Sequence, residues 1–204
     1  GVMVHREIMS QFDILEAFKK ELWDLENHWY LFLDLYGHEH KKRRREVLFP
    51  SHPLLFDIVK LRLHDHVLLI ISRLLDPEKT CGKHNLSLKT LISTYKPFSS
   101  EALEVIENAQ SDISANFTKI KTHRNKRISH NDLTNKLNFD LPTIPIKEIE
   151  LVIDSLELVF NTISIDKRNL SHEFFPRNLD DNYKAGHLLD ILEAGRKALG
   201  LDVR

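Results

Sequence analysis

The sequence is poor in several features that would otherwise define its class. It has one cysteine, Cys81, which excludes an internal disulfide framework and fits a reducing compartment. Its 29 lysines and arginines nearly balance its 30 aspartates and glutamates, so no whole-molecule field steers it to nucleic acid or membrane. It shows no N-terminal signal pattern and no apolar run of about 18 residues, so we expect a soluble cytoplasmic protein without a membrane partner.

Glycine is also scarce, and the scarcity favours helices. There are only six glycines, and none of the usual two-residue hairpin turns separates alternating strands. Apolar residues recur at spacings of three and four, which predicts long helices over roughly residues 4–36, 54–75, 99–130, 145–164 and 180–199. For the second of these the predicted core stripe is Ile58, Leu61, Leu68, Ile71 and Leu75. We therefore predict an all-α fold, an antiparallel bundle of about five to six helices.

The segments between these helices are predicted from prolines and polar residues. Residues 38–53 are expected to form a polar and basic connector. Residues 76–85 are expected to form a loop, followed by a short helix with Asn85 as its N-cap. The domain prediction is one helical domain over residues 1–165, with residues 166–204 as a connector and helix packing on that domain.

The helix predicted over residues 99–130 changes character toward its end. Its apolar stripe consists of Leu103, Ile106, Ile113, Phe117 and Ile120. At about 100° per residue, Arg124 lies about 40° to one side of Ile120, and Arg127 about 20° to the other. The cations therefore continue the inward face. Either the helix overruns its core into solvent, as basic residues at a helix C-terminus can, or this face lines a cleft that binds an anion.

The residues of this helix end resemble a known signature. The stretch "HRNKRISHND" is similar to the signature of the HEPN superfamily, small helical domains of bacterial defence and toxin systems. That signature is an arginine, then a polar residue, and then a histidine a few positions later. Arg124, Asn125 and His130 match it.

A second stretch narrows the resemblance. "ISRLLDPEKTCGKHNLSLKTLI" (71–92) resembles the AbiU-like abortive-infection branch of that superfamily, and the whole resemblance covers roughly residues 10–165. It implies a metal-independent endoribonuclease without cofactor, acting in phage defence or a toxin-like system. His130 would be the acid or base, Arg124 would bind the phosphate, and Asn125 would orient the substrate or the histidine. The implied partners are RNA, a second copy whose motif shares the cleft, and an antitoxin protein.

Neighbouring residues extend this candidate site. Arg127, His123 and Lys126 are candidate RNA contacts, with solvated surface as the alternative interpretation. Asp65 is a candidate partner for the arginine–histidine cleft. In one straight helix the arginine and histidine of the signature stand about 120° apart. Pairing across a two-fold axis relieves that angle, because one phosphate can meet the arginine of one chain and the histidine of the other.

Other polar patterns have simpler interpretations. The run "KKRRR" (41–45) is either a solvated connector, which we favour, or a contact to RNA backbone. "HEH" (38–40) and "HDH" (64–66) suggest metal ligands at first sight. No third or fourth ligand has recognisable spacing to them, so no metal is expected. His64 falls on the apolar stripe of its helix and is expected to be a hydrogen-bonded core residue.

Two other functions fit the same sequence. One is a non-catalytic helical module that binds RNA, a nucleotide or a protein through the basic face, and the other is a structural helical dimer. Mutation of His130 separates them from an enzyme, because only an enzyme loses cleavage while it keeps RNA binding.

Overall fold

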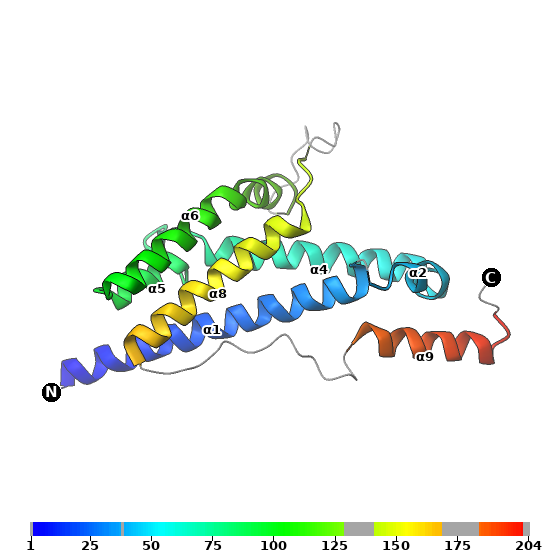
Figure 1. The fold of residues 1–204 in the computed structure, drawn as a ribbon, viewed down its shortest axis with the longest axis horizontal. Coiled ribbons are helices and arrows are strands. Elements are labelled where there is room, and N and C mark those ends of the chain that lie inside the picture. Colours follow the sequence, from blue (N-terminus) through cyan, green and yellow to red (C-terminus); the bar gives the residue numbers. More distant parts are fainter. Residues whose placement is uncertain (1, 38, 129–140, 169–183, 202–204) are drawn as a thin grey trace. The chain divides into compact units, whose positions relative to one another are not determined.

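The computed structural model describes residues 2–37, 39–128, 141–168 and 184–201, which are almost entirely helical (Figure 1). The long helices are α1 (Val2–Tyr36), α4 (Pro53–Leu74), α6 (Ser100–His123), α8 (Ile146–Arg168) and α9 (Ala185–Ala198). The shorter helical segments are α2 (Lys41–Arg43), η1 (Arg44–Leu48), α3 (Phe49–Ser51), α5 (Leu88–Tyr95) and η2 (Arg124–Ile128). Both η segments are π-helices. The prediction of an all-α fold is confirmed.

The chain divides into two compact units. The first contains residues 1–25 and 68–176, and the second contains residues 26–67 and 177–204. Helices α1 and α4 therefore contribute to both units, and each unit has buried apolar residues of its own. The domain boundary predicted near residue 165 stays a prediction.

The core of the first unit forms around an antiparallel pair of helices, α6 and α8 (Figure 1). Lys119 Nζ lies 2.5 Å from Glu148 Oε1, which joins the end of α6 to the start of α8. At the opposite ends, the backbone N–H of Ser99 donates to Asp166 Oδ1 over 3.3 Å. Buried apolar residues on four helices complete the core: Phe18, Leu22, Leu68, Ile71, Ile106, Ile113, Ile120, Ile149, Ile153, Leu156 and Phe160.

The first half of α4 departs from the predicted core stripe. Ile58 and Leu61 were expected inside, but they are 47% and 56% exposed, and Leu54 and Leu55 beside them are also exposed. The spacing of apolar residues predicts that a helix has an apolar face, but not that another element covers it. This face does not indicate a membrane segment. Within the described residues, no helix has the length and hydropathy needed to cross a bilayer.

The second unit has a small apolar core where a polar connector was predicted. Val47, Leu48 and Leu189 are buried, with Tyr36, Phe56, Leu188 and Leu192 packed against them. The prediction for residues 38–53 is therefore wrong in its main point, because residues 41–51 are helical and carry part of this core. The two apolar residues of this segment follow five basic ones, with only Glu46 between them. The composition of this segment is mainly basic, so the short apolar pair was not predicted to be buried.

The segment before α5 is more ordered than the predicted loop. Strands β1 (Lys79–Thr80) and β2 (Lys83–His84) form an antiparallel hairpin. Cys81 and Gly82 make its turn with φ of 50° and 79°, and positive values at both central positions are typical of type I′ turns. The hairpin was not predicted because the first of the two central turn positions holds a cysteine, where asparagine, aspartate or glycine is usual.

The N-cap of α5 is Ser87, not Asn85 as predicted. Ser87 Oγ accepts a hydrogen bond from the backbone N–H of Thr90 over 3.4 Å. The side-chain amide of Asn85 instead donates to the carbonyl oxygen of Pro77 and to Thr80 Oγ1, each over 2.7 Å. Asparagine and serine are both good N-caps, and Asn85 stabilises the hairpin.

Helix α9 ends at Ala198, close to the end predicted at residue 199, and Gly200 follows soon after. Gly200 has φ of 67°, and its N–H donates to the carbonyl oxygen of Lys197 over 3.1 Å. The N–H of Leu201 donates to the carbonyl oxygen of Arg196 over 2.9 Å. These two bonds form a Schellman motif, which favours glycine because its central residue is left-handed.

Candidate functional site

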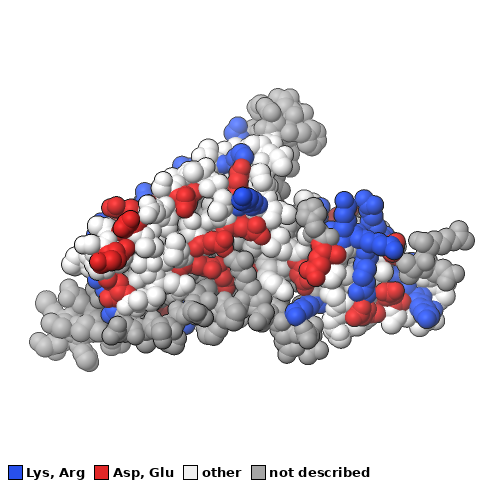
Figure 2. Space-filling model, in the orientation of Figure 1, with Lys and Arg blue, Asp and Glu red and all other residues white. Residues whose placement is uncertain are grey.

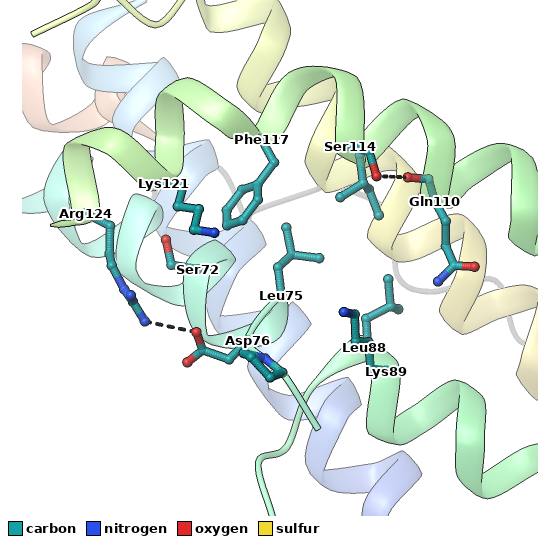
Figure 3. Close-up of a pocket in the computed structure, with 12 residues that line it drawn as sticks. Ser72, Leu75, Asp76, Leu88, Lys89, Gln110, Ser114, Phe117, Lys121 and Arg124 are labelled. Carbon is teal, nitrogen blue, oxygen red and sulfur yellow. Dashed lines mark hydrogen bonds and ion pairs between the residues drawn. The ribbon is translucent and has the colours of Figure 1, made fainter. Parts of the chain in front are cut away.

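One face of α6 lines a pocket in the first unit (Figure 3). The residues from α6 and η2 are Gln110, Ile113, Ser114, Phe117, Lys121 and Arg124. They recur every three or four positions, so they lie on one side of the helix. The end of α4 and the start of α5 supply the other walls, with Ser72, Leu75, Asp76, Pro77, Leu88 and Lys89. The volume of about 310 Å³ is within the range of small-molecule sites.

The pocket combines an apolar surface with an excess of positive charge. Its apolar side chains are Leu75, Pro77, Leu88, Ile113 and Phe117, and its charged ones are Lys89, Lys121, Arg124 and Asp76. The lining therefore carries three cations and one carboxylate. Figure 3 shows Phe117 reaching from α6 toward Leu75, with Lys121 beside it. Such a lining suits a ligand with both a flat apolar part and an anionic part.

The predicted signature begins at a change of helix type. Helix α6 ends at His123, and residues Arg124–Ile128 form the π-helix η2. The backbone N–H of Arg124 donates to the carbonyl oxygens of Ile120 and Lys121. The 120° angle between Arg124 and His130 holds only for a straight α-helix, and residues 124–128 depart from one because a π turn is wider than an α turn. Single π turns inside helices frequently lie at functional sites.

Arg124 is held at the edge of the pocket by two acceptors. Its Nη2 donates to Asp76 Oδ1 over 2.9 Å, and its Nη1 donates to Asn125 Oδ1 over 2.9 Å (Figure 3). The side chains of Arg124 and Asp76 are 31% and 29% exposed. A guanidinium has five N–H donors. The two bonds fix its orientation, and the remaining N–H groups can donate to an anion.

The inward orientation predicted for Arg124 agrees with these contacts. The neighbouring residues that were predicted to contact RNA have other surroundings. His123 Nε2 lies 2.6 Å from the carbonyl oxygen of Pro142, so this ring contacts the protein itself. Lys126 is exposed. Arg127 belongs to η2, but its side chain and all of His130 lie outside the described residues. The roles proposed for these residues toward RNA stay predictions.

Asp65 lies on the part of α4 that belongs to the second unit. Its Oδ2 is 3.9 Å from Arg62 Nη1, and its Oδ1 is 3.9 Å from His64 Nδ1. Its role beside the arginine–histidine cleft stays a prediction. The acidic partner that Arg124 has in the first unit is Asp76.

The basic run 41–45 contributes partly to structure. Arg44 is buried and donates from Nη1 to the carbonyl oxygen of Leu35 over 3.1 Å. Arg43 bonds to Asp190 over 2.7 Å and to Glu193 over 2.9 Å, both on α9. The other cations of the run are exposed, and lysines and arginines form a visible basic patch in Figure 2. The solvated interpretation therefore fits three of the five positions.

The two histidines of the pattern at 64–66 each pack against an aromatic ring, whereas His38 of the pattern at 38–40 lies outside the described residues. His64 packs against Phe32 with ring centroids 5.6 Å apart, and it is only partly buried. His66 contacts His28 of α1, with centroids 4.4 Å apart. This pair of imidazoles supplies two of the four ligands that a structural zinc site needs. The expectation of no metal stays a prediction.

Sequence analysis missed two features of the pocket. Asp76 was assigned only to a loop, although it stands in the stretch that carried the second resemblance. Phe117 was assigned to the core stripe of α6, yet it is only partly buried and lines the pocket. An aromatic residue two turns before a basic helix end is the signal that could have suggested a ligand face.

Comparison with known proteins identifies the family. The model of the AbiU2 family of HEPN domains matches residues 13–184, most of the chain. No curated protein and no solved structure matches the chain. The matched range includes Asp76, Arg124 and Asn125. The chain therefore belongs to the AbiU2 family of the HEPN superfamily, as the resemblance of its two stretches indicated.

Proposed function

We propose that this protein is a metal-independent endoribonuclease that acts as a dimer in phage defence or a toxin-like system. One observation carries the proposal. In a chain of the AbiU2 family, the arginine of the signature is fixed by Asp76 and Asn125 at the edge of a cationic pocket. A phosphate suits a guanidinium, because two parallel N–H groups match two of its oxygens.

The chemistry needs only what RNA and these side chains supply. The 2′-hydroxyl of the substrate attacks the adjacent phosphorus, and the bond from phosphorus to the 5′-oxygen breaks. His130 takes the hydroxyl proton or donates one to the leaving oxygen. Arg124 stabilises the extra charge on the phosphorane. The products are a 2′,3′-cyclic phosphate and a 5′-hydroxyl.

Asn125 supports this assignment through its hydrogen bonding. Its Oδ1 accepts from Arg124, so its amide nitrogen can donate to a phosphate oxygen or to the imidazole of His130. Loss of this residue should therefore disturb two groups at once. Asp76 acts on the other side of the guanidinium as a positioning residue.

A second copy is part of the proposal. The apolar face of α4, formed by Leu54, Leu55, Ile58 and Leu61, is exposed in the described part of the chain. Contiguous exposed apolar residues of this kind commonly mark protein–protein contacts. A dimer allows Arg124 of one chain and His130 of the other to act on one phosphate.

The test uses the purified full chain and a labelled oligoribonucleotide. Wild type should cleave it in the presence of EDTA and leave a 2′,3′-cyclic phosphate, and it should not cleave the matching 2′-O-methyl strand. His130→Ala should abolish cleavage and keep RNA binding nearly intact. Lys147→Ala, which removes an exposed cation on α8, is the control for loss of one charge. RNA bound but never cleaved by wild type would support a binding module instead.

A further inference from the structure

We propose that the pocket between α6, the end of α4 and the start of α5 binds one nucleobase of the RNA, next to the phosphate held by Arg124. The position of this base beside a scissile phosphate rests on the proposed ribonuclease function, whereas binding of a base does not. The ligand class is a nucleoside monophosphate or the equivalent unit of a single RNA strand. All residues that line the pocket belong to the first unit, so it does not require a second copy.

Phe117 provides the stacking surface. It is only partly buried, and Figure 3 shows its ring projecting from α6 into the pocket. Leu75 and Leu88 line the pocket opposite α6. A base placed between an aromatic ring and aliphatic side chains gains stacking and loses apolar contact with water. Single-stranded RNA is recognised in this way because its bases are free to leave a helix.

Polar groups stand where the edge of a base would meet them. Gln110 offers one donor and one acceptor from its amide, a pair that matches the edge of a base. Ser114 Oγ donates to the backbone carbonyl of Gln110 over 2.8 Å, and its oxygen can still accept. Ser72 is 2% exposed, and its hydroxyl has no hydrogen-bond partner within the described residues. A buried hydroxyl without a partner is unfavourable, so a polar ligand atom would satisfy it.

The cations place the phosphate at one end of the pocket. Lys121 and Arg124 follow Phe117 by one and two turns along α6 and η2. A base against Phe117 therefore has its 5′- or 3′-phosphate within the part of the lining that carries these cations. Asp76 sits at the same end and keeps Arg124 oriented. An uncharged nucleoside would not engage these cations, so the phosphate should contribute to affinity.

The direct test is titration of the full chain with each of the four nucleoside 5′-monophosphates, followed calorimetrically. At least one should bind at millimolar or lower concentration, and Phe117→Leu should weaken it roughly tenfold or more, because base–aromatic stacking is lost. Phe98→Leu is the matched control. Phe98 is also partly buried and in the first unit, but Lys167 lies over its ring, 5.0 Å from the centroid, and it does not line the pocket. No binding by wild type, or equal binding by wild type and Phe117→Leu, would overturn the inference.

A cleavage experiment separates this inference from the proposed function. With an oligoribonucleotide, Phe117→Leu should raise KM and change kcat little, and an abasic ribose beside the cleaved bond should remove the difference between wild type and variant. Cleavage with an unchanged KM in Phe117→Leu would leave the ribonuclease standing and refute the base pocket. Binding of a nucleotide at the pocket, with no cleavage of any RNA, would support the pocket and refute the ribonuclease.

Discussion

Two π-helical segments of this chain carry arginines in basic runs, and they differ in what those arginines contact. In η1 of the second unit, Arg44 is 8% exposed and donates to the carbonyl oxygen of Leu35 in the last turn of α1. In η2 of the first unit, Arg124 is partly exposed and bonds to two side chains at the edge of a pocket. Similar local sequence therefore completes a helix end in one place and lines a pocket in the other.

The difference lies in the acceptor. The last carbonyl groups of a helix lack partners within the helix, so a guanidinium that bonds to one completes the fold. Asp76 and Asn125 are side chains, and a phosphate can exchange with them or join them. Burial also acts on the charge, because loss of water lowers the pKa of Arg44, whereas Tyr36 nearby raises it by a smaller amount. A cation buried against a carbonyl is unavailable to a ligand, and a cation beside a pocket is available to one.

The largest expected effect that tests this comparison is on cleavage. Arg124→Ala should lower kcat by about 10²–10³, because a positioned donor to the transition state is lost. Arg124→Lys should recover only part of the rate, since a lysine keeps the charge and loses the planar fork. Single-turnover cleavage of a labelled oligoribonucleotide measures both.

The control for this change is the arginine of the other π segment. The Arg44→Met variant should cleave RNA with the kcat of wild type when the rate is divided by the concentration of folded protein. If Arg44→Met lost as much kcat as Arg124→Ala in a folded state, the distinction between the two segments would fail.

The second effect is on stability, and here the larger loss is expected at Arg44 of η1. Arg44→Met should lower the free energy of unfolding by about 1.5–3 kcal/mol, because a buried hydrogen bond from a charged donor is lost and the carbonyl of Leu35 is left unsatisfied. Urea unfolding followed by circular dichroism measures it. Arg45→Met, at the adjacent exposed position, should change the same quantity by less than about 0.5 kcal/mol. Equal losses for both variants would show that the buried bond contributes little.

Sequence periodicity predicts most of the fold and part of the site. It predicts the long helices and the inward orientation of Arg124, because both depend on residues close together in the chain. It does not predict that Asp76 meets Arg124, since the two are separated by 48 positions and packing brings them together. It also does not predict the burial of Arg44, because the composition of "KKRRR" is that of a solvated run. The exposed face of α4 shows the opposite error. Its apolar pattern predicts burial, but no element among the described residues covers it.

A smaller effect concerns the phenol that lies near Arg44. Tyr36 donates its hydroxyl proton to the carbonyl oxygen of Phe56 over 2.9 Å, and Tyr36→Phe should lower the free energy of unfolding by about 1 kcal/mol at neutral pH. Burial, and next the carboxylate of Asp57, raise the pKa of Tyr36 to about 12, while Arg44 acts in the opposite direction. Because the folded state favours the protonated phenol, this contribution is fully present below the ordinary pKa of about 10 and is lost as pH rises toward 12.

Unfolding of wild type and Tyr36→Phe at several pH values tests this directly. The stability of wild type relative to Tyr36→Phe should be constant from pH 7 to about 9 and should fall steadily between about 10 and 12. A difference that stayed constant up to pH 12 would mean that the phenol does not titrate differently in the two states.

The smallest expected effect is the change in stability on loss of Arg43, compared with loss of its neighbour Arg44. Arg43 bonds to Asp190 and Glu193 at the surface, and hydrogen bonding to Asp190 is the main cause of its raised pKa. Exposed pairs are screened by solvent and salt, so Arg43→Met should lower the free energy of unfolding by only about 0.2–1 kcal/mol, and less at 1 M salt. The loss for Arg44→Met should not depend on salt, because its partner is an uncharged carbonyl. If the two arginines responded alike to salt, burial of Arg44 would not account for its role, and the contrast between η1 and η2 would have to rest on Asp76 alone.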